Sequence, residues 1–101
     1  MSDENIIVTI DPDLEELIPG FLENRSNDIR NLKAASAKND FETLRSIGHS
    51  LKGVGGGYGF DRITEIGAEI EASAKIGDIE KINASITVLE EYLDKIEIRF
   101  E

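Results

Sequence analysis

The last part of the chain carries the pattern that most constrains the fold. Large apolar residues recur there at alternating intervals of three and four positions. They are Ile79, Ile82, Ile86, Leu89, Leu93, Ile96 and Phe100. An α-helix completes a turn in about 3.6 residues, so this spacing places all of them on one face. The pattern predicts a long helix whose apolar face packs into a bundle of nearly aligned helices.

Helix boundaries upstream are marked by proline and by capping residues. Asp11-Pro12 is a favourable helix start and predicts a short helix near 12–18. Pro19 disfavours helical geometry at Ile18, so we expect a turn there and then a longer helix over about 20–38.

Capping signals also separate the next helices. Asn39 with Glu42 resembles a capping box and would start the third helix. Gly59 followed by Asp61 predicts the C-cap of one helix and then the N-cap of a fourth helix, over about 61–76. Gly77-Asp78 predicts another stop and start before the last helix.

The segment Ile6–Ile10 has the composition of a β-strand. No second strand is predicted downstream, so we interpret it as an extended arm on a helical body. The expected fold class is all-α: an up-and-down antiparallel four-helix bundle with a short N-terminal helix and an extended N-terminal arm. The length of 101 residues suits a single domain, 1–101, with the arm at 1–10 and the helical body at about 12–100.

Composition excludes several classes of function. A formal net charge of -10 argues against binding to nucleic acid, which depends on clustered Lys and Arg. The chain has no Cys and one His, so no metal site is expected. The apolar run Ile6–Ile10 is too short to cross a membrane, and we expect a cytoplasmic protein without membrane contact.

The lone histidine, His49, does not lie where a core histidine would. A helical wheel of the third helix gathers its apolar residues in one sector, with His49 almost opposite the centre of that sector. The apolar residues are Phe41, Leu44, Ile47, Leu51, Val54 and Tyr58. Although a histidine within a helical pattern is more often a satisfied core residue, the wheel favours an exposed side chain here.

The neighbours of His49 on its own face suit an anionic group. Arg45 lies at i-4, Lys52 at i+3 and Gly53 at i+4. Phosphorylated imidazole carries about two negative charges, which Lys52 and Arg45 would attract and position. The missing side chain at Gly53 would leave room for a partner to approach.

Five glycines fall within residues 53–59, where the helix would be expected to continue. Each interior glycine costs about 1 kcal/mol relative to alanine, so the run indicates a use. One use is access to His49, and another is close packing of Gly55 and Gly59 against a neighbouring helix. The alternative is that the helix ends near Gly53 and a flexible loop follows.

The segment His49-Ser50-Leu51-Lys52-Gly53, with Gly59 ten residues after the histidine, resembles the signature of histidine-phosphotransfer (HPt) domains. The resemblance extends to the acidic start at 14–19 and to an Ile70-Glu71 pair that is similar to a later Leu-Glu pair of the family. It implies a four-helix bundle in which His49 is the phosphoacceptor, Lys52 positions the phosphoryl group and Gly53 permits access. Residues 55–57 are richer in glycine than is usual for the family.

The resemblance also implies partners. His49 would take a phosphoryl group from a receiver-domain aspartyl phosphate or a sensor histidine kinase and pass it to another receiver domain. The chain would be a phosphocarrier rather than an enzyme, without a cofactor of its own, because Mg²⁺ and the acidic pocket would belong to the receiver. We expect a monomer.

A docking surface is expected on the histidine helix and one neighbour, with Ser50, Gly56, Tyr58 and Phe60 as candidates. For Tyr58 and Phe60, packing in the core is the more common role. Two other functions stay open: a helical adaptor that binds two-component proteins without phosphotransfer, and an independent kinase or phosphatase. The chain has no nucleotide-binding motif to support the latter.

Overall fold

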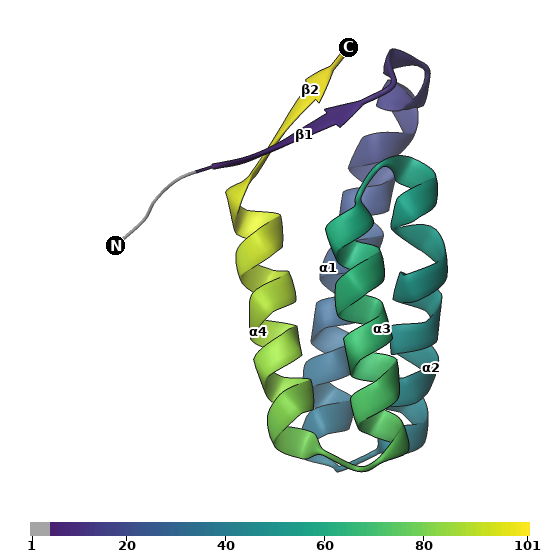
Figure 1. Ribbon diagram of the computed structural model, residues 1–101, viewed down its shortest axis with the longest axis vertical. Helices are drawn as coiled ribbons and strands as arrows, with labels where there is room; N and C mark the ends of the chain where they lie inside the picture. Colours follow the sequence, from purple (N-terminus) through teal and green to yellow (C-terminus); the bar gives the residue numbers. More distant parts are fainter. Residues whose placement is uncertain (1–4) are drawn as a thin grey trace.

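Four α-helices run alternately up and down, and a short two-stranded sheet lies across one end of the bundle (Figure 1). This computed structural model describes residues 5–101. The elements in chain order are β1 (Ile6–Ile10), a 3-10 helix (Pro12–Leu17), α1 (Ile18–Ala37), α2 (Phe41–Val54), a 3-10 turn (Gly56–Tyr58), α3 (Asp61–Lys75), α4 (Ile79–Lys95) and β2 (Ile96–Phe100). The expected all-α, up-and-down antiparallel four-helix bundle is confirmed.

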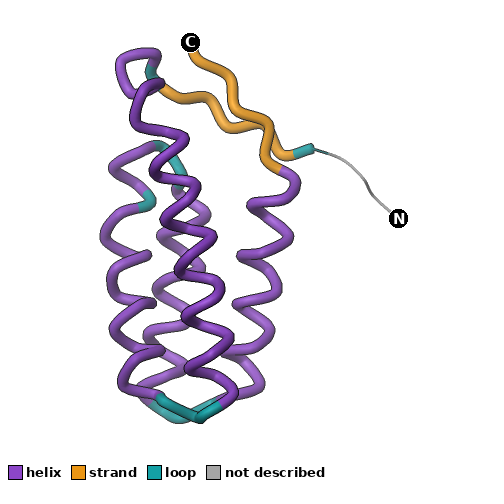
Figure 2. Tube along the Cα trace, turned by 180° about the vertical axis from the view of Figure 1, so that it is seen from behind, coloured by secondary structure: helices purple, strands orange, loops and turns teal. Residues whose placement is uncertain are grey.

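The bundle core is built from the apolar stripes that the helical spacing predicted. The fully buried positions on the four helices include Leu32, Leu44, Leu51, Ile63, Ile66, Ile70, Ile82 and Leu89. Among the helix pairs, α2 and α3 make the most extensive contact. Tight turns at the end away from the sheet connect α1 to α2 and α3 to α4 (Figure 2).

The expectation of a lone extended arm was wrong, because Ile6–Ile10 pairs in parallel with β2. The last helix ends at Lys95, and the backbone is extended at Ile96. Ile96 and Phe100 are four residues apart, which is about one turn of a helix but also two repeats of a β-strand. The helical prediction for residues 96–100 was wrong because this spacing does not distinguish the two structures. Ile96 and Phe100 therefore fit either structure, whereas Ile98 between them fits only a strand. The helical body runs to 95 rather than 100.

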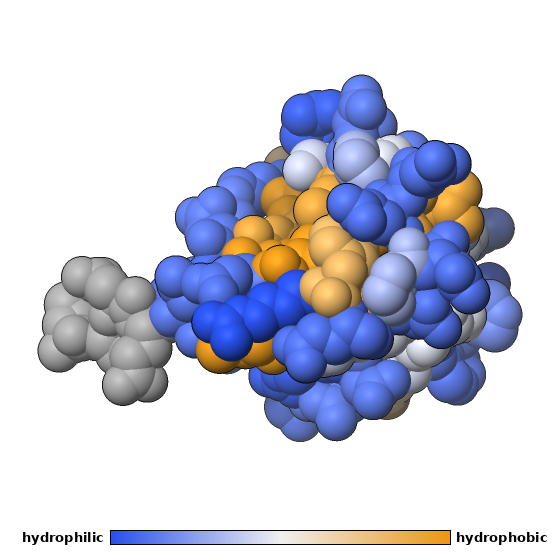
Figure 3. Space-filling view, turned by 90° about the horizontal axis from the view of Figure 1, so that it is seen from above, coloured by the Kyte–Doolittle hydropathy of each residue, from blue (hydrophilic) through white to orange (hydrophobic). Residues whose placement is uncertain are grey.

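The sheet closes the upper end of the bundle. Val8 and Ile10 are buried, so the inner face of β1 belongs to the core. Figure 3 looks onto this end and shows apolar surface surrounded by hydrophilic side chains. The large apolar side chains that stay exposed on β1 and the adjoining 3-10 helix are those of Ile6, Ile7 and Leu17.

Three boundaries differ from expectation by one or two residues. The 3-10 helix passes directly into α1 at Ile18 without a turn, because Pro19 falls in the first helical turn, where its missing N–H costs nothing. The cap of α2 is Asp40, whose carboxylate accepts the Thr43 N–H, rather than Asn39, which is left-handed with φ 52°. Asp61 is the first residue of α3 and not its cap.

The predicted break before the last helix is confirmed at Gly77-Asp78. Gly77 has a φ of 68°, which favours glycine over residues with a Cβ. Asp78 is the N-cap of α4, where its carboxylate accepts the backbone N–H of Lys81.

Candidate functional site

The side chain of His49 lies on the surface of α2. It is 71% exposed, while Leu44 and Leu51 on the opposite side of the same helix are fully buried. The helical wheel therefore placed the histidine correctly, and the alternative of a core histidine is wrong.

One edge of the imidazole ring is held by a carboxylate from the next helix. The Nδ1 atom of His49 lies 2.9 Å from Oε2 of Glu71, on α3. Ionised carboxylates only accept hydrogen bonds, so this contact requires the proton on Nδ1. When the ring is neutral, its lone pair is then on Nε2, the nitrogen that Glu71 does not contact.

The same carboxylate also binds Lys52. The Nζ atom of Lys52 donates to Oε1 of Glu71 at 3.3 Å, so each carboxylate oxygen has its own partner. The Glu71 side chain is only 10% exposed, whereas that of Lys52 is half exposed. A largely buried charge is stable only when it is paired, and Glu71 is paired on both sides.

The pKa of Glu71 reflects these contacts. The hydrogen bond with His49 lowers the pKa of the carboxyl group, burial partly opposes the shift, and the hydrogen bond with Lys52 lowers it further. Glu71 is accordingly a carboxylate near neutral pH, as its role of accepting from both neighbours requires.

Two glycines allow α2 and α3 to approach closely enough for this contact. A Cβ atom on Gly67 would lie 2.4 Å from the backbone N of Lys52, and one on Gly48 would lie 2.7 Å from the backbone N of Glu71. Both distances are shorter than non-bonded atoms tolerate. The crossing of these two helices, directly beside His49, therefore depends on the absence of both side chains.

The other predicted neighbours of His49 are placed differently. Gly53 is exposed, and a Cβ there would meet no atom within 4 Å, so the surface beside the histidine is open. Arg45 is also exposed, but no hydrogen bond or ion pair joins it to His49 or Glu71. Of the two predicted cations, Lys52 alone is tied to the carboxylate that holds the ring.

The glycine-rich segment after α2 is ordered by contacts with α3 rather than left as a free loop. A Cβ on Gly55 would lie 2.7 Å from both the Phe60 carbonyl and the Thr64 backbone N, as predicted for a close-packed glycine. Gly59 is different: it has space for a Cβ but a φ of 90°. The N–H of Gly56 donates to Oγ1 of Thr64 at 2.8 Å.

Two candidate docking residues belong instead to an aromatic cluster. Phe60 is fully buried, so its proposed contact with a partner is incorrect. Its ring stacks on Phe21 of α1 at 4.8 Å between centroids, and half-buried Tyr58 packs on the same ring at 4.6 Å. These rings anchor the glycine-rich segment to α1. Ser50 and Gly56 are exposed and remain candidates.

Sequence reasoning did not assign Glu71, Gly48 or Gly67 to the site. A signal for each was present. Glu71 lies next to Ile70 and one turn from Ala74, on the apolar side of its helix, where an isolated acid needs a partner. Gly48 and Gly67 are glycines inside helices, which indicate a close approach by another backbone.

The described part of the chain offers no group of three or more His, Asp or Glu side chains that would hold a metal ion. None of its helices is long and apolar enough to span a bilayer.

Comparison with known proteins identifies the family. Neither the curated proteins nor the solved structures contain a significant match to the chain. A family model, that of the Hpt domain, matches residues 16–98. The matched region includes all four helices and the contact of His49 with Glu71. The chain therefore belongs to the Hpt domain family, whose members carry out histidine phosphotransfer in phosphorelays.

Proposed function

We propose that this chain is a phosphorelay carrier in which Nε2 of His49 accepts a phosphoryl group and passes it on. The observation that carries the proposal is the contact of 2.9 Å between Nδ1 of His49 and Glu71. It fixes the proton on the held nitrogen and leaves the nucleophilic lone pair on the other. With the side chain 71% exposed, a large partner has access to the ring.

The transfer requires little chemistry from this chain. The Nε2 lone pair attacks phosphorus of a receiver-domain aspartyl phosphate, a P–N bond forms, and the P–O bond to the aspartate carboxylate breaks. The ring gains positive charge during this step, while its proton stays on Nδ1. The ionised Glu71 stabilises that charge and needs no rearrangement to do so.

Lys52 is proposed to act on the transferred group. Its ammonium lies 3.3 Å from Glu71 and its side chain is half exposed, so the charge is held beside the ring yet open to solvent. There it would attract the phosphoryl oxygens as they arrive. Gly53, one residue further, would let the partner surface approach. Arg45 could add to the positive field, although no hydrogen bond or ion pair with another residue of 5–101 positions it.

The partners follow from the family. Hpt domains interact with receiver domains and kinases of two-component systems. For this chain we propose a sensor histidine kinase or a phosphorylated receiver as donor and a second receiver as acceptor. The receiver would supply Mg²⁺ and its own acidic pocket. A cytoplasmic location and a monomeric state form part of the same proposal.

The test is phosphorylation of the purified chain by a panel of phosphorylated receiver domains, read by intact mass spectrometry. We expect a gain of one phosphoryl group that is labile in acid and stable in base. His49→Gln should abolish the gain and keep the fold, because the side chain is exposed and contributes little to packing. Thr87→Ala, at an exposed position of α4 away from the histidine helix, is the control and should still be labelled.

The alternative of an adaptor without phosphotransfer makes the opposite prediction. Receiver binding without labelling in the wild type, unchanged in His49→Gln, would establish the adaptor and overturn the carrier. Labelling from ATP with no partner protein would instead indicate an independent kinase.

A further inference from the structure

The face between α3 and α4 carries two hollows that the phosphotransfer site does not use. The lower hollow, of about 440 Å³, is lined by Glu69, Ala72, Ser73, Lys81, Ala84 and Ser85. The upper one, of about 370 Å³, is lined by Ile6, Arg62, Val88, Glu91, Tyr92 and Lys95. Together these residues define the α3/α4 seam. His49 belongs to α2 and faces the other side of α3, so the seam is a separate surface.

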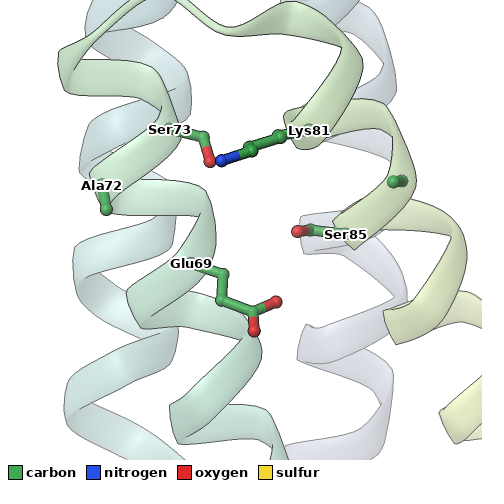
Figure 4. A pocket seen from close by; sticks show the side chains of 6 residues that line it. Glu69, Ala72, Ser73, Lys81 and Ser85 are labelled. Carbon is green, nitrogen blue, oxygen red and sulfur yellow. The ribbon is translucent and has the colours of Figure 1, made fainter.

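The lower hollow is lined by polar groups of both helices. Ser73 and Ser85 are each only 7% exposed, and neither residue leaves a buried polar side-chain atom without a hydrogen-bond partner. In Figure 4 both hydroxyls point into the space between the two helices, and the side chains of Glu69 and Lys81 reach toward the same space. These side chains are the donors and acceptors that a molecule bound in the lower hollow would meet.

The shape of the seam fits a helix. On α4 its lining residues are Lys81, Ala84, Ser85, Val88, Glu91, Tyr92 and Lys95. Their spacing of three and four places them along one face of α4 over about four turns, about 21 Å at 1.5 Å per residue, and within this face Ser85 and Tyr92 are themselves buried. Small side chains line the lower half, which lets another helix approach closely. Val88 and Ile6 supply exposed apolar surface in the upper half.

The charges of the seam disfavour a second copy as its natural occupant. Lys81 and Lys95 each lie seven residues from Val88, near the middle of the open face. Two copies related by a two-fold axis that passes near Val88 at right angles to α4 would have antiparallel α4 helices, with Lys81 against Lys95 of the other copy. Like charges at both ends of an interface oppose association.

The same charges indicate which kind of partner would be complementary to the seam. The seam has Lys81 at one end and Lys95 with Arg62 at the other, with Glu69 and Glu91 between them. We propose that the α3/α4 seam docks an amphipathic helix of a partner protein, with an apolar stripe of small residues and an acidic side chain at each end, about fourteen residues apart. Binding there leaves His49 accessible, so a partner can remain attached while a receiver exchanges phosphate.

The test uses a synthetic helical peptide and the full chain labelled with ¹⁵N. The probe has 18 residues, Ala and Leu along one face, and Glu at positions 2 and 16. Its matched control has Lys at those two positions. We expect the Glu peptide to bind about tenfold more tightly and to shift the amide signals of Ala72, Ser73, Ala84 and Val88, with no shift at His49.

Variants of the chain test whether the peptide binds at the seam and through its charges. The double substitution Lys81→Glu/Lys95→Glu should reverse the preference, so that the Lys peptide binds better. Ala84→Arg should fill the lower hollow and abolish binding of the Glu peptide, whereas Ala34→Arg, at an exposed alanine of α1, should leave it unchanged. Circular dichroism checks that each variant is folded.

Several outcomes would overturn the proposal. They are equal affinity for the two peptides, no binding of either at millimolar concentration, shifts centred outside the seam, and dimerisation of the chain through the seam in sedimentation experiments. None of these measurements depends on phosphotransfer, so failure here would leave the proposed carrier function standing.

Discussion

His49 and Glu71 face each other across the crossing of α2 and α3, with Nδ1 of the ring 2.9 Å from Oε2 of the carboxylate. The residues are 22 positions apart in the chain. The contact sets both the tautomer of the ring and the direction in which its free nitrogen points. Glu71 is therefore proposed as a positioning residue, which acts on the phosphoryl group only through His49.

Removing the charge of Glu71 should slow phosphotransfer. We expect Glu71→Gln to lower the rate of labelling by about 10- to 100-fold, by analogy with the range for replacing the group that orients a metal-binding histidine. The rate is measured by quenched-flow labelling from a phosphorylated receiver. The ¹⁵N signals of the ring supply a second readout, because Glu71→Ala should allow the Nε2–H tautomer to populate. Unchanged rates and an unchanged tautomer would show that Glu71 is merely structural.

The lowered pKa of Glu71 predicts how stability depends on pH. Its value in the folded chain lies below the usual 4.5, so the stabilisation is fully present above about pH 4.5 and is lost as pH falls through the folded pKa. Asp40, whose pKa is lowered by its hydrogen bonds to Thr43, acts in the same direction. The measured quantity is therefore the difference in unfolding free energy between the wild type and Glu71→Gln. That difference should shrink on acidification, and a constant difference between pH 7 and pH 3 would contradict the assignment.

The glycines at the helix crossing should be intolerant of a side chain. Gly67→Ala places a Cβ 2.4 Å from the backbone of Lys52, where no flexible group can move aside. We expect a loss of about 1–3 kcal/mol or more in stability, measured by urea denaturation, together with slower labelling as α3 shifts. A variant as stable as the wild type would mean that the helices separate easily.

Replacing Gly53 with alanine should have the opposite effect on stability from replacing Gly67. A Cβ there meets nothing within 4 Å, so Gly53→Ala should raise stability by about 0.5–1 kcal/mol through its higher helix propensity. If Gly53 serves access to His49, the more stable variant should nevertheless transfer phosphate more slowly from a receiver. Labelling at the wild-type rate would remove Gly53 from the docking surface.

The pairing of β1 with β2 makes the N-terminal segment part of the core. Ile10 is 2% exposed and Ile7 is 54% exposed, although they lie on the same strand. Ile10→Ala should therefore cost about 2–5 kcal/mol in thermal or urea unfolding, while Ile7→Ala should change stability by less than about 0.5 kcal/mol. Equal effects of the two substitutions would show that the strand does not close the bundle.

The sequence by itself determined the helical bundle and the exposed histidine. Both depend on periodicity along one helix: the apolar stripes fix which faces are buried, and His49 falls opposite the stripe of its own helix. The breaks at Gly77 and Asp78 and the close-packed Gly55 also follow from local chemistry. The resemblance of the histidine segment to Hpt domains agrees with the family match over residues 16–98.

Only the tertiary structure decided what surrounds the histidine and how the chain closes. The Glu71 contact depends on how α2 and α3 cross, and that crossing depends on Gly48 and Gly67, which lie on different helices. Phe60 is buried because Phe21 lies beneath it. Residues 96–100 form a strand because β1 is there to receive their hydrogen bonds. Each of these outcomes is fixed by a partner distant in sequence, and the periodicity of a single segment contains no information about that partner.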